Sequence, residues 1–259
     1  MTRPDPTFGR LLLMPNTLDL GAAEVPLTDV IAGGVIAAAS RLLHWVVEDA
    51  RSARAFLNRV NKVAPLAQPL QQTLIAELPR PPKGSPRPAT TSGPSPWVAL
   101  LAPALAGHDI GLLSEAGLPG VADPGALLVA AAHELGIPVV ALSGPSSITL
   151  AIAASGLNGQ SFVFHGYLPA DAAPRRARLR ELEATSKRLQ QTQVFIETPY
   201  RNGAMLDAAL EALQPSTRLA ISCGLTLADG WSRCRTIAQW KAAKQALPDR
   251  VPAVFSLLG

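Results

Sequence analysis

The sequence predicts an α/β protein of two domains. Along its 259 residues, short apolar runs typical of strands alternate with longer segments of helical periodicity. Such alternation indicates parallel strands joined by right-handed crossovers, so residues 1–157 should form an N-terminal domain with a mainly parallel sheet. In residues 158–259, Asp229-Gly230 is typical of a hairpin turn, and the C-terminal domain should therefore hold a mixed sheet.

The elements of the N-terminal domain follow from its apolar pattern and its helix breakers. The expected strands are 10–14, 42–47, 109–113 and 137–142. The expected helices are 26–40, 50–60, 97–106 and 124–135, with a further helix opening at Ser146-Ser147. Asp49 and Asp123 stand where a side-chain oxygen can cap the start of a helix. Prolines exclude a helix or a central strand from residues 79–96, which we expect to be a surface loop, a tolerated insertion more readily than a dedicated RNA arm.

The C-terminal domain shows the same two patterns. Its expected strands are 161–166, 193–197, 218–223 and 251–258. Its expected helices are 174–189, 202–213 and 237–247. The helix 174–189 carries a basic group with an apolar stripe of Leu179, Leu182 and Leu189.

Composition and charge narrow the class of protein. A net charge of +4 and a pI near 9.4 are compatible with an anionic partner such as RNA. Arg41 and Pro145 interrupt the longest apolar runs, so no membrane span of about 20 residues is expected. The N-terminus lacks the apolar stretch of a signal peptide, which makes the cytoplasm the expected location. Cys223 and Cys234 fit neither a disulfide framework nor a zinc site, and the histidines stand apart, so we expect no metal centre.

The stretch Leu112–Gly125, LLSEAGLPGVADPG, leads from an apolar strand into a helix. Gly117, Pro119 and Gly120 allow a sharp turn and a close approach of the backbone to a ligand. Ligands of open α/β sheets bind at the carboxyl ends of strands, where this loop falls. An ordinary strand-to-helix connection explains the same residues. The nucleotide motifs G-x-G-x-x-G and G-x-x-x-x-G-K-[ST] and the elbow G-x-S-x-G do not occur, so nicotinamide, P-loop and hydrolase sites are unsupported.

The segment SEAGLPGVADPG closely resembles the signature of the tetrapyrrole methylase superfamily, in the branch of the small-subunit ribosomal RNA methyltransferases. SGPSSITLAIAASG, FHGYLP and FIETPYR resemble further segments of that family in the same order. The resemblance implies a methyltransferase that holds S-adenosylmethionine (SAM) in a cleft between its domains, forms a homodimer and methylates a ribose 2′-hydroxyl of ribosomal RNA. Two segments, PNTLDLG and CGLTL, depart from the family pattern and leave the acceptor open.

The resemblance also implies which residues form the cofactor site. SAM needs backbone groups for its adenine, an apolar wall, and polar groups for its ribose and methionine ends. The residues implied to bind it are Ser114, Glu115, Ala116, Gly117, Pro119, Val121, Asp123, Pro145, Ser146, Ser147 and Thr226.

Candidate residues for the acceptor lie in the C-terminal domain. Glu197, at a strand end, is a candidate for base or positioning work, although an ion pair with Arg201 explains it equally well. Arg175, Arg176 and Arg178 of the basic helix, with Arg201, are the candidate RNA contacts, and a solvated helix face is their other interpretation.

Two other functions remain open from the sequence. The same fold could methylate a tetrapyrrole or another small molecule, which a deep apolar acceptor cavity would favour over RNA. The altered PNTLDLG and CGLTL segments also fit a module that binds SAM without transferring its methyl group.

Overall fold

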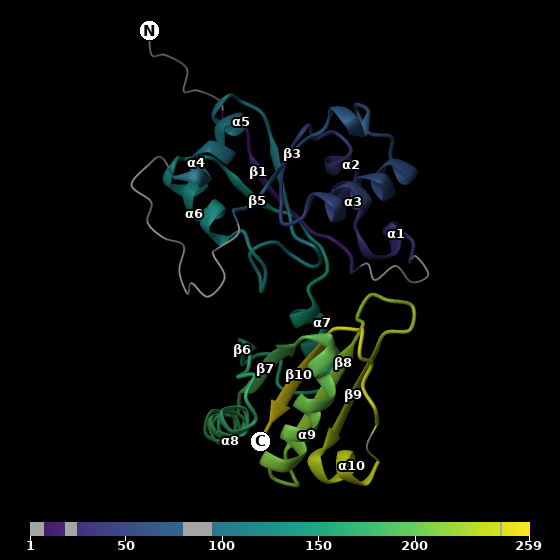
Figure 1. Ribbon diagram of the computed structural model, residues 1–259, viewed down its shortest axis with the longest axis vertical. Helices are drawn as coiled ribbons and strands as arrows, with labels where there is room; N and C mark the ends of the chain where they lie inside the picture. Colours follow the sequence, from purple (N-terminus) through teal and green to yellow (C-terminus); the bar gives the residue numbers. More distant parts are fainter. Residues whose placement is uncertain (1–7, 19–24, 80–94, 244) are drawn as a thin grey trace. The chain divides into compact units, whose positions relative to one another are not determined.

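The computed structural model describes residues 8–18, 25–79, 95–243 and 245–259, which form two compact units, 1–145 and 146–259 (Figure 1). The division falls earlier than the predicted boundary at residue 157. Helix α7 (Ser147–Ser155) belongs to the second unit because its Ile148 and Ile152 pack with Val194 and Val254 of the second sheet. The segment that follows the first sheet thus supplies one layer of the next unit.

The first unit holds a five-stranded, wholly parallel sheet in the order β3-β2-β4-β1-β5. Its strands are β1 (Leu11–Met14), β2 (His44–Val47), β3 (Leu74–Glu77), β4 (Ile110–Leu113) and β5 (Val139–Ala141). Its helices are α1 (Leu27–Val30), α2 (Gly33–Ala39), α3 (Ala50–Val63), α4 (Pro96–Leu100), α5 (Ala102–Leu105) and α6 (Ala126–Glu134), with a 3-10 turn at Leu70–Gln72. The predicted parallel sheet is confirmed.

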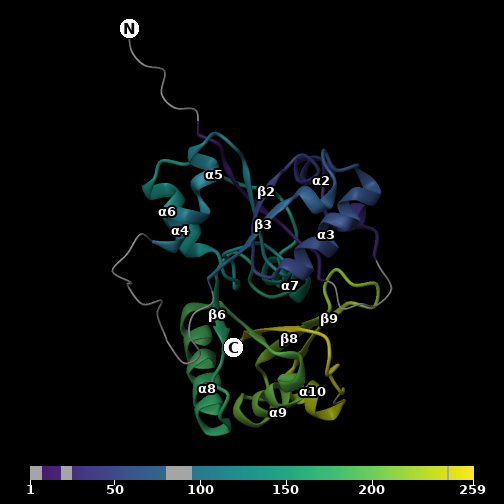
Figure 2. The ribbon, with the colours of Figure 1, turned by 45° about the horizontal axis from the view of Figure 1, so that its top comes forward.

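Helices cover both faces of this sheet. Helices α2 and α3 lie on one side, and α4, α5 and α6 on the other, in both views (Figures 1 and 2). The core beneath α1–α3 is built around Trp45 and Phe56, whose rings meet edge to face at 6.2 Å. The core beneath α4–α6 is built around Leu101, Leu112 and Leu128. Burial on both faces explains why the strands read as continuous apolar runs rather than as alternating ones.

At three places this unit differs from the sequence prediction. The single helix expected at 26–40 is two helices, because Ile31 and Ala32 are extended and Gly33-Gly34 favours a helix weakly. The helix expected at 97–106 is likewise split into α4 and α5. Strand β3, which was not predicted from the sequence, is short and partly exposed. Of the proline-rich segment 79–96, residues 80–94 lie outside the described residues.

The second unit holds a five-stranded mixed sheet in the order β6-β7-β10-β8-β9. Its strands are β6 (Phe162–Tyr167), β7 (Thr192–Glu197), β8 (Arg218–Cys223), β9 (Trp231–Thr236) and β10 (Ala253–Leu258). Its further helices are α8 (Ala172–Leu189), α9 (Asn202–Ala212) and α10 (Ile237–Ala242), with a 3-10 turn at Pro199–Arg201. Only β6 and β7 pair in parallel; the hairpin around Asp229-Gly230 pairs β8 with β9 in antiparallel fashion, so the predicted mixed sheet is confirmed.

The two faces of the second sheet have separate cores. Phe195 and Phe255 stack at 5.5 Å in the core under α8, α9 and α10, and α7 covers the opposite face. Because Phe195 faces α8, the alternation along β7 directs Gln193 and Glu197 to that same face. No helix in the described ranges is long and apolar enough to cross a membrane.

Candidate functional site

The loop that follows β4 is fastened to the loop that follows β1. Asn16, only 5% exposed, donates from Nδ2 to the carbonyl oxygens of Ser114 (3.1 Å) and Glu115 (2.9 Å). Its backbone exchanges two further hydrogen bonds with Gly117, at 2.9 and 3.0 Å. The first turn of the SEAGLPGVADPG segment is therefore fixed by a residue about one hundred positions earlier in the chain.

Glycine is required at two positions along this edge of the sheet. Gly117 has φ +74°, a left-handed conformation that L side chains rarely adopt. Gly144, after β5, approaches Pro15 so closely that an added Cβ would lie 2.1 Å from the proline Cβ. The loops after β1, β4 and β5 thus meet at the carboxyl ends of their strands, with β1 in the middle. Strand order reverses around this point, which is where open α/β sheets bind ligands.

Carboxylates gather around the same loop. The pKa of Asp123 is raised to about 6, chiefly by burial and next by the nearby negative charge of Glu48, against the opposing hydrogen bond from Ser114. The backbone N–H of Glu115 donates to Glu48 Oε2 at 3.1 Å. The loop therefore presents a partly buried acidic rim, which favours a positively charged ligand group.

The predicted cap at Asp123 is wrong. Helix α6 begins at Ala126, after Gly125 with φ +131°, and has no side-chain cap. The chain needs the residues up to Gly125 to complete the loop, so the Asp123 side chain turns to Ser114 instead. The predicted cap at Asp49 is confirmed, because Asp49 Oδ1 accepts from the Ser52 N–H at 2.7 Å.

The residues implied for the cofactor divide between the two units. Ser114 and Pro119 are buried, Ala116 and Asp123 are half-buried, and Glu115 and Val121 are exposed on the loop after β4. Pro145 belongs to the same edge, since its carbonyl oxygen lies 4.0 Å from the position a Cβ of Gly117 would take. Ser146, Ser147 and Thr226 belong to the second unit.

Two of these residues, Ser146 and Thr226, have local features of their own. Ser146 precedes α7 without capping it by its side chain, and its carbonyl oxygen accepts from the Thr149 hydroxyl at 3.2 Å. Thr226, between β8 and β9, has φ +78°. A β-branched residue in this region is a genuine outlier, of the kind that clusters at functional sites.

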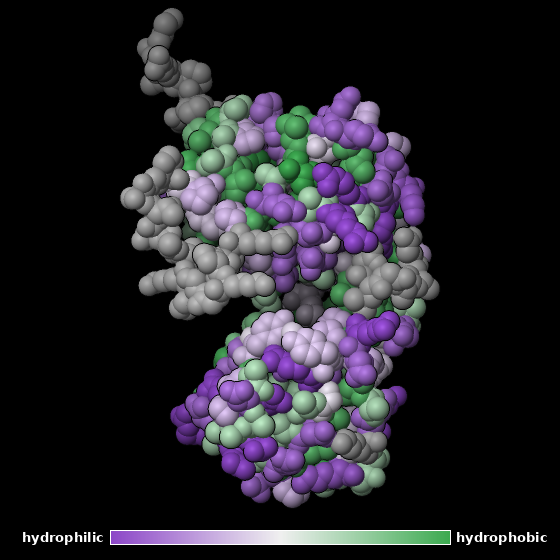
Figure 3. Space-filling model, viewed as in Figure 1, coloured by the Kyte–Doolittle hydropathy of each residue, from purple (hydrophilic) through white to green (hydrophobic). Residues whose placement is uncertain are grey.

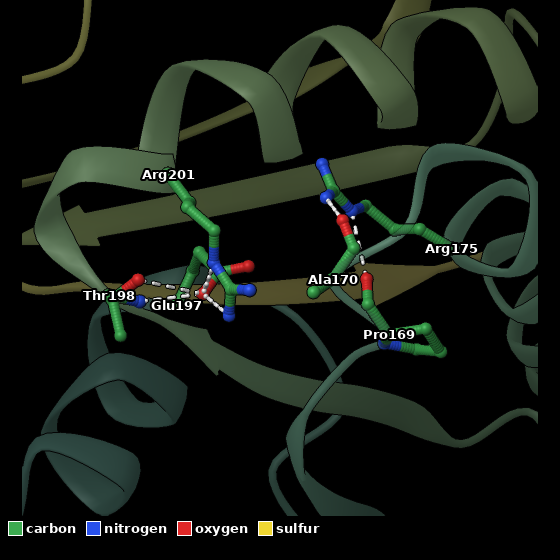
Figure 4. A network of polar contacts seen from close by, with 6 residues as sticks. All are labelled: Pro169, Ala170, Arg175, Glu197, Thr198 and Arg201. Atoms are coloured by element: carbon green, nitrogen blue, oxygen red, sulfur yellow. Dashed lines mark hydrogen bonds and ion pairs between the residues drawn. The ribbon is translucent and has the colours of Figure 1, made fainter.

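Glu197 ends β7 with a fully buried side chain (Figure 4). Its Oε1 takes four hydrogen bonds, from Nε and Nη2 of Arg201 (2.9 and 2.6 Å) and from the backbone N–H and hydroxyl of Thr198 (2.7 and 3.2 Å). Its Oε2 is buried and has no partner among the described residues. The expected ion pair with Arg201 is present, and it occupies one of the two carboxylate oxygens.

The basic helix does not present all its arginines to solvent. Arg175 is 5% exposed and donates to the carbonyl oxygens of Pro169 and Ala170, so the expectation that it lies on an exposed RNA-contacting face is wrong. It stands one turn before Leu179 and therefore on the buried face of α8. Arg176 and Arg178 are about a third exposed and pair with Glu211 (3.3 Å) and Glu181 (2.7 Å). Figure 3 shows hydrophilic residues over α8. Leu189, expected in the buried stripe, is 48% exposed.

Neither Asn16 nor Glu48 was among the site residues predicted from the sequence. Both follow a strand directly or within two residues, and they lie at the same edge as the SEAGLPGVADPG loop. Their position after β1 and β2 was the available signal, because carboxyl ends of parallel strands converge. In the described ranges no group of three or more His, Cys, Asp or Glu side chains is placed to hold a metal ion.

The fold is that of known two-domain methyltransferases. A crystal structure titled as the methyltransferase CobJ superposes with a TM-score of 0.57 over 97% of this chain and 94% of that one, at 16% sequence identity. The family model described as tetrapyrrole (corrin/porphyrin) methylases matches residues 35–231, and the chain belongs to this family. The resemblance found in the sequence is thereby confirmed.

Two curated relatives are closer in sequence. The ribosomal RNA small subunit methyltransferase I of Mesorhizobium japonicum is 40% identical over 127 residues, which are 49% of this chain and 42% of that protein. The protein of the same name from Mycobacterium bovis is 42% identical over 120 residues, 46% of this chain and 41% of that protein. The matched part thus spans about two fifths of the length of these relatives.

The residues at the first unit's edge fit SAM. The cofactor carries a positive sulfonium and an ammonium group, and the acidic rim of Glu48, Glu115 and Asp123 suits them. The left-handed turn at Gly117 leaves no side chain over the backbone there. An anionic cofactor would meet no basic side chain in this loop. A neutral cofactor would gain nothing from the carboxylates.

Proposed function

We propose that this chain is a SAM-dependent methyltransferase that methylates a ribose 2′-hydroxyl in small-subunit ribosomal RNA. The observation that carries the proposal is the SEAGLPGVADPG loop, held by Asn16 at the carboxyl edge of a parallel sheet and rimmed by carboxylates. The names of the two relatives support ribosomal RNA as the substrate. We also propose that the protein is a homodimer and acts in the cytoplasm.

In this proposal the first unit carries the cofactor loop, and the second unit carries the candidate RNA contacts. SAM, when bound, supplies an electrophilic methyl group. The residues proposed to hold it are Ser114, Glu115, Ala116, Gly117, Pro119, Val121, Asp123, Pro145, Ser146, Ser147 and Thr226. Methyl transfer is an in-line displacement, so the main work of these residues is to fix the geometry of donor and acceptor.

Contacts to RNA are proposed for Arg176, Arg178 and Arg201. Each is at least a fifth exposed and pairs with a carboxylate of the chain. Exposed pairs of this kind are worth little, so Arg176 and Arg178 can exchange Glu211 and Glu181 for phosphate groups at small cost. Their contribution should weaken as the salt concentration rises.

The first test is calorimetric titration with S-adenosylhomocysteine (SAH). Gly117→Val places a β-branched residue in a left-handed turn and should abolish binding. Gly33→Ala is the matched control, because nothing lies within 4 Å of its added Cβ and its backbone is not left-handed. Wild-type protein that is folded and does not bind SAH would overturn the cofactor assignment.

The second test is methyl transfer from labelled SAM to unmodified small ribosomal subunits, with nucleoside analysis of the product. Recovery of a 2′-O-methylnucleoside is the expected result. Transfer to a tetrapyrrole instead would replace the acceptor, and SAH binding without transfer to either would leave a binding module.

A further inference from the structure

The loops that follow β6 and β7 lie side by side at the carboxyl ends of these two strands of the second sheet. These strands are its only parallel pair, and Tyr167, the last residue of β6, is in register with Ile196. The segment 168–171 after β6 therefore runs beside Glu197 and the 3-10 turn Pro199–Arg201. As in the first unit, this is the edge at which an α/β sheet offers its ligand-binding groups.

Glu197 has an acceptor at this edge that the protein leaves unused. Its Oε1 takes four hydrogen bonds, whereas the buried Oε2 takes none from the described residues. A buried carboxylate oxygen without a donor is costly, and native proteins rarely leave one so. In Figure 4 this oxygen points away from Thr198, toward the side on which Ala170 and Arg175 are drawn.

Arg175 shows the complementary feature. Its guanidinium is buried and, among the described residues, its hydrogen bonds go to the carbonyl oxygens of Pro169 and Ala170 and to no carboxylate. A guanidinium has five N–H donors, so some remain for a further acceptor. A hydroxyl group donates one hydrogen bond and accepts others, which is the chemistry that each of these two groups still lacks among the described residues.

An exposed aromatic ring stands beside these groups. Tyr200 is 75% exposed, and the guanidinium carbon of Arg201 lies 5.9 Å from its ring centre. Exposed aromatic rings backed by arginine are the usual stacking surface for unpaired bases of RNA. The ring thus favours a nucleotide over a small apolar acceptor.

We infer that Glu197 and Tyr200 form a nucleotide subsite, in which Glu197 Oε2 accepts a hydrogen bond from a ribose hydroxyl of the RNA and Tyr200 stacks on a base. The inference rests on the proposed function and names the residues that select its substrate. Arg201 fixes the Glu197 carboxylate through Oε1 and leaves Oε2 for the ligand. A ribose hydroxyl recognised in this way distinguishes RNA from DNA.

The substitution Glu197→Gln replaces the free hydrogen-bond acceptor, Oε2, with a hydrogen-bond donor. The amide oxygen can keep the four donors of Oε1, and the amide nitrogen, a donor, then takes the place of Oε2. We expect kcat/KM for methylation of unmodified small ribosomal subunits to fall about 10-fold or more, the effect of one hydrogen bond to a charged group. SAH affinity should stay near that of the wild type, whereas the thermal unfolding midpoint should fall, because the neutral amide no longer balances the charge of Arg201. The matched control is Asp249→Asn, which neutralises an exposed carboxylate of the same unit that has no part in the proposed RNA contacts.

Tyr200→Leu provides a second variant whose folding is not at risk, because the ring is exposed. Loss of stacking should raise KM for the subunits about 5-fold or more while kcat changes little. If Glu197→Gln folds and its kcat/KM stays within about twofold of the wild-type value, the inference is overturned. A buried water would then be the partner of Oε2. Should Glu197→Gln fail to fold, an unchanged KM in Tyr200→Leu overturns it. Wild-type protein that binds SAH and does not methylate the subunits overturns the proposed acceptor and this subsite together.

Discussion

Asp123 offers the sharpest test of the acidic rim in the first unit. Its pKa is raised from 3.8 to about 6, chiefly by burial and next by the charge of Glu48. The folded protein therefore holds this proton more tightly than the unfolded chain does. Stability contributed by the protonated carboxyl is present at low pH and declines as the pH rises from about 4 to about 6. Asp123→Asn removes that decline, because the amide stays neutral at every pH.

The size of the effect follows from the displaced pKa. A pKa difference of about two between the folded and the unfolded chain corresponds to ~3 kcal/mol, because each pKa unit is worth about 1.36 kcal/mol. Because the side chain is only half-buried, solvent screening reduces this to about 1–2 kcal/mol. We expect Asp123→Asn to be more stable than the wild type by that amount at pH 7.5 and to differ little from it at pH 4.

Urea denaturation followed by tryptophan fluorescence and circular dichroism at both pH values measures this difference. Asp229→Asn, which neutralises an exposed carboxylate in the β8–β9 loop, is the control and should show no gain at pH 7.5. Equal stability of Asp123→Asn and wild type at pH 7.5, or a gain of the same size at pH 4, would refute the argument.

Three further expectations follow from the described contacts. Asn16→Ala should lower the free energy of unfolding by about 2 kcal/mol and weaken SAH binding, measured by denaturation and calorimetry, because it removes two hydrogen bonds to buried or partly buried carbonyls. Gly144→Ala should weaken SAH binding in the same titration by forcing the loop after β5 away from Pro15; unchanged affinity would mean that this contact is not needed. At pH 8, mass spectrometry after iodoacetamide treatment should find Cys234 modified and Cys223 intact until the protein is unfolded, because Cys234 is exposed whereas burial raises the pKa of the Cys223 thiol to about 11.

The parts of the fold that the sequence predicted are those with strong local patterns. Strands β1 and β4 are buried on both faces and read as short apolar runs, and helix α8 ends within a residue of its expected limit. Strand β3 has no such pattern, because it lies at the edge of its sheet and half of its residues are exposed. Local pattern fails where burial is partial, since polar and apolar residues are then both tolerated.

The site was predictable where a loop carries a recognisable segment and not where it depends on distant partners. Residues 114–123 were found from their own sequence, whereas the role of Asn16 emerges only when β1 lies beside β4. Arg175 was misplaced for a different reason. Its basic character suggested solvent, while its spacing of four residues before Leu179 already placed it on the buried face of α8. Here the helical period should have outweighed the charge.

The position of β1 within its sheet has a consequence for the order in which the protein is made. β1 pairs with β4 and β5, so Leu11 cannot form its strand pairs until Ile110 and Val139 have been synthesised. During synthesis this apolar strand leaves the ribosome about a hundred residues ahead of its partners. The chain between them must close a long loop, at an entropic cost, before the strand pairing can stabilise the fold. We expect the first unit to complete itself late, with Asn16 reaching the loop after β4 in the same event. A nascent chain that has not yet exposed β5 should therefore lack a finished cofactor loop, even though most of the residues that compose it have already been translated.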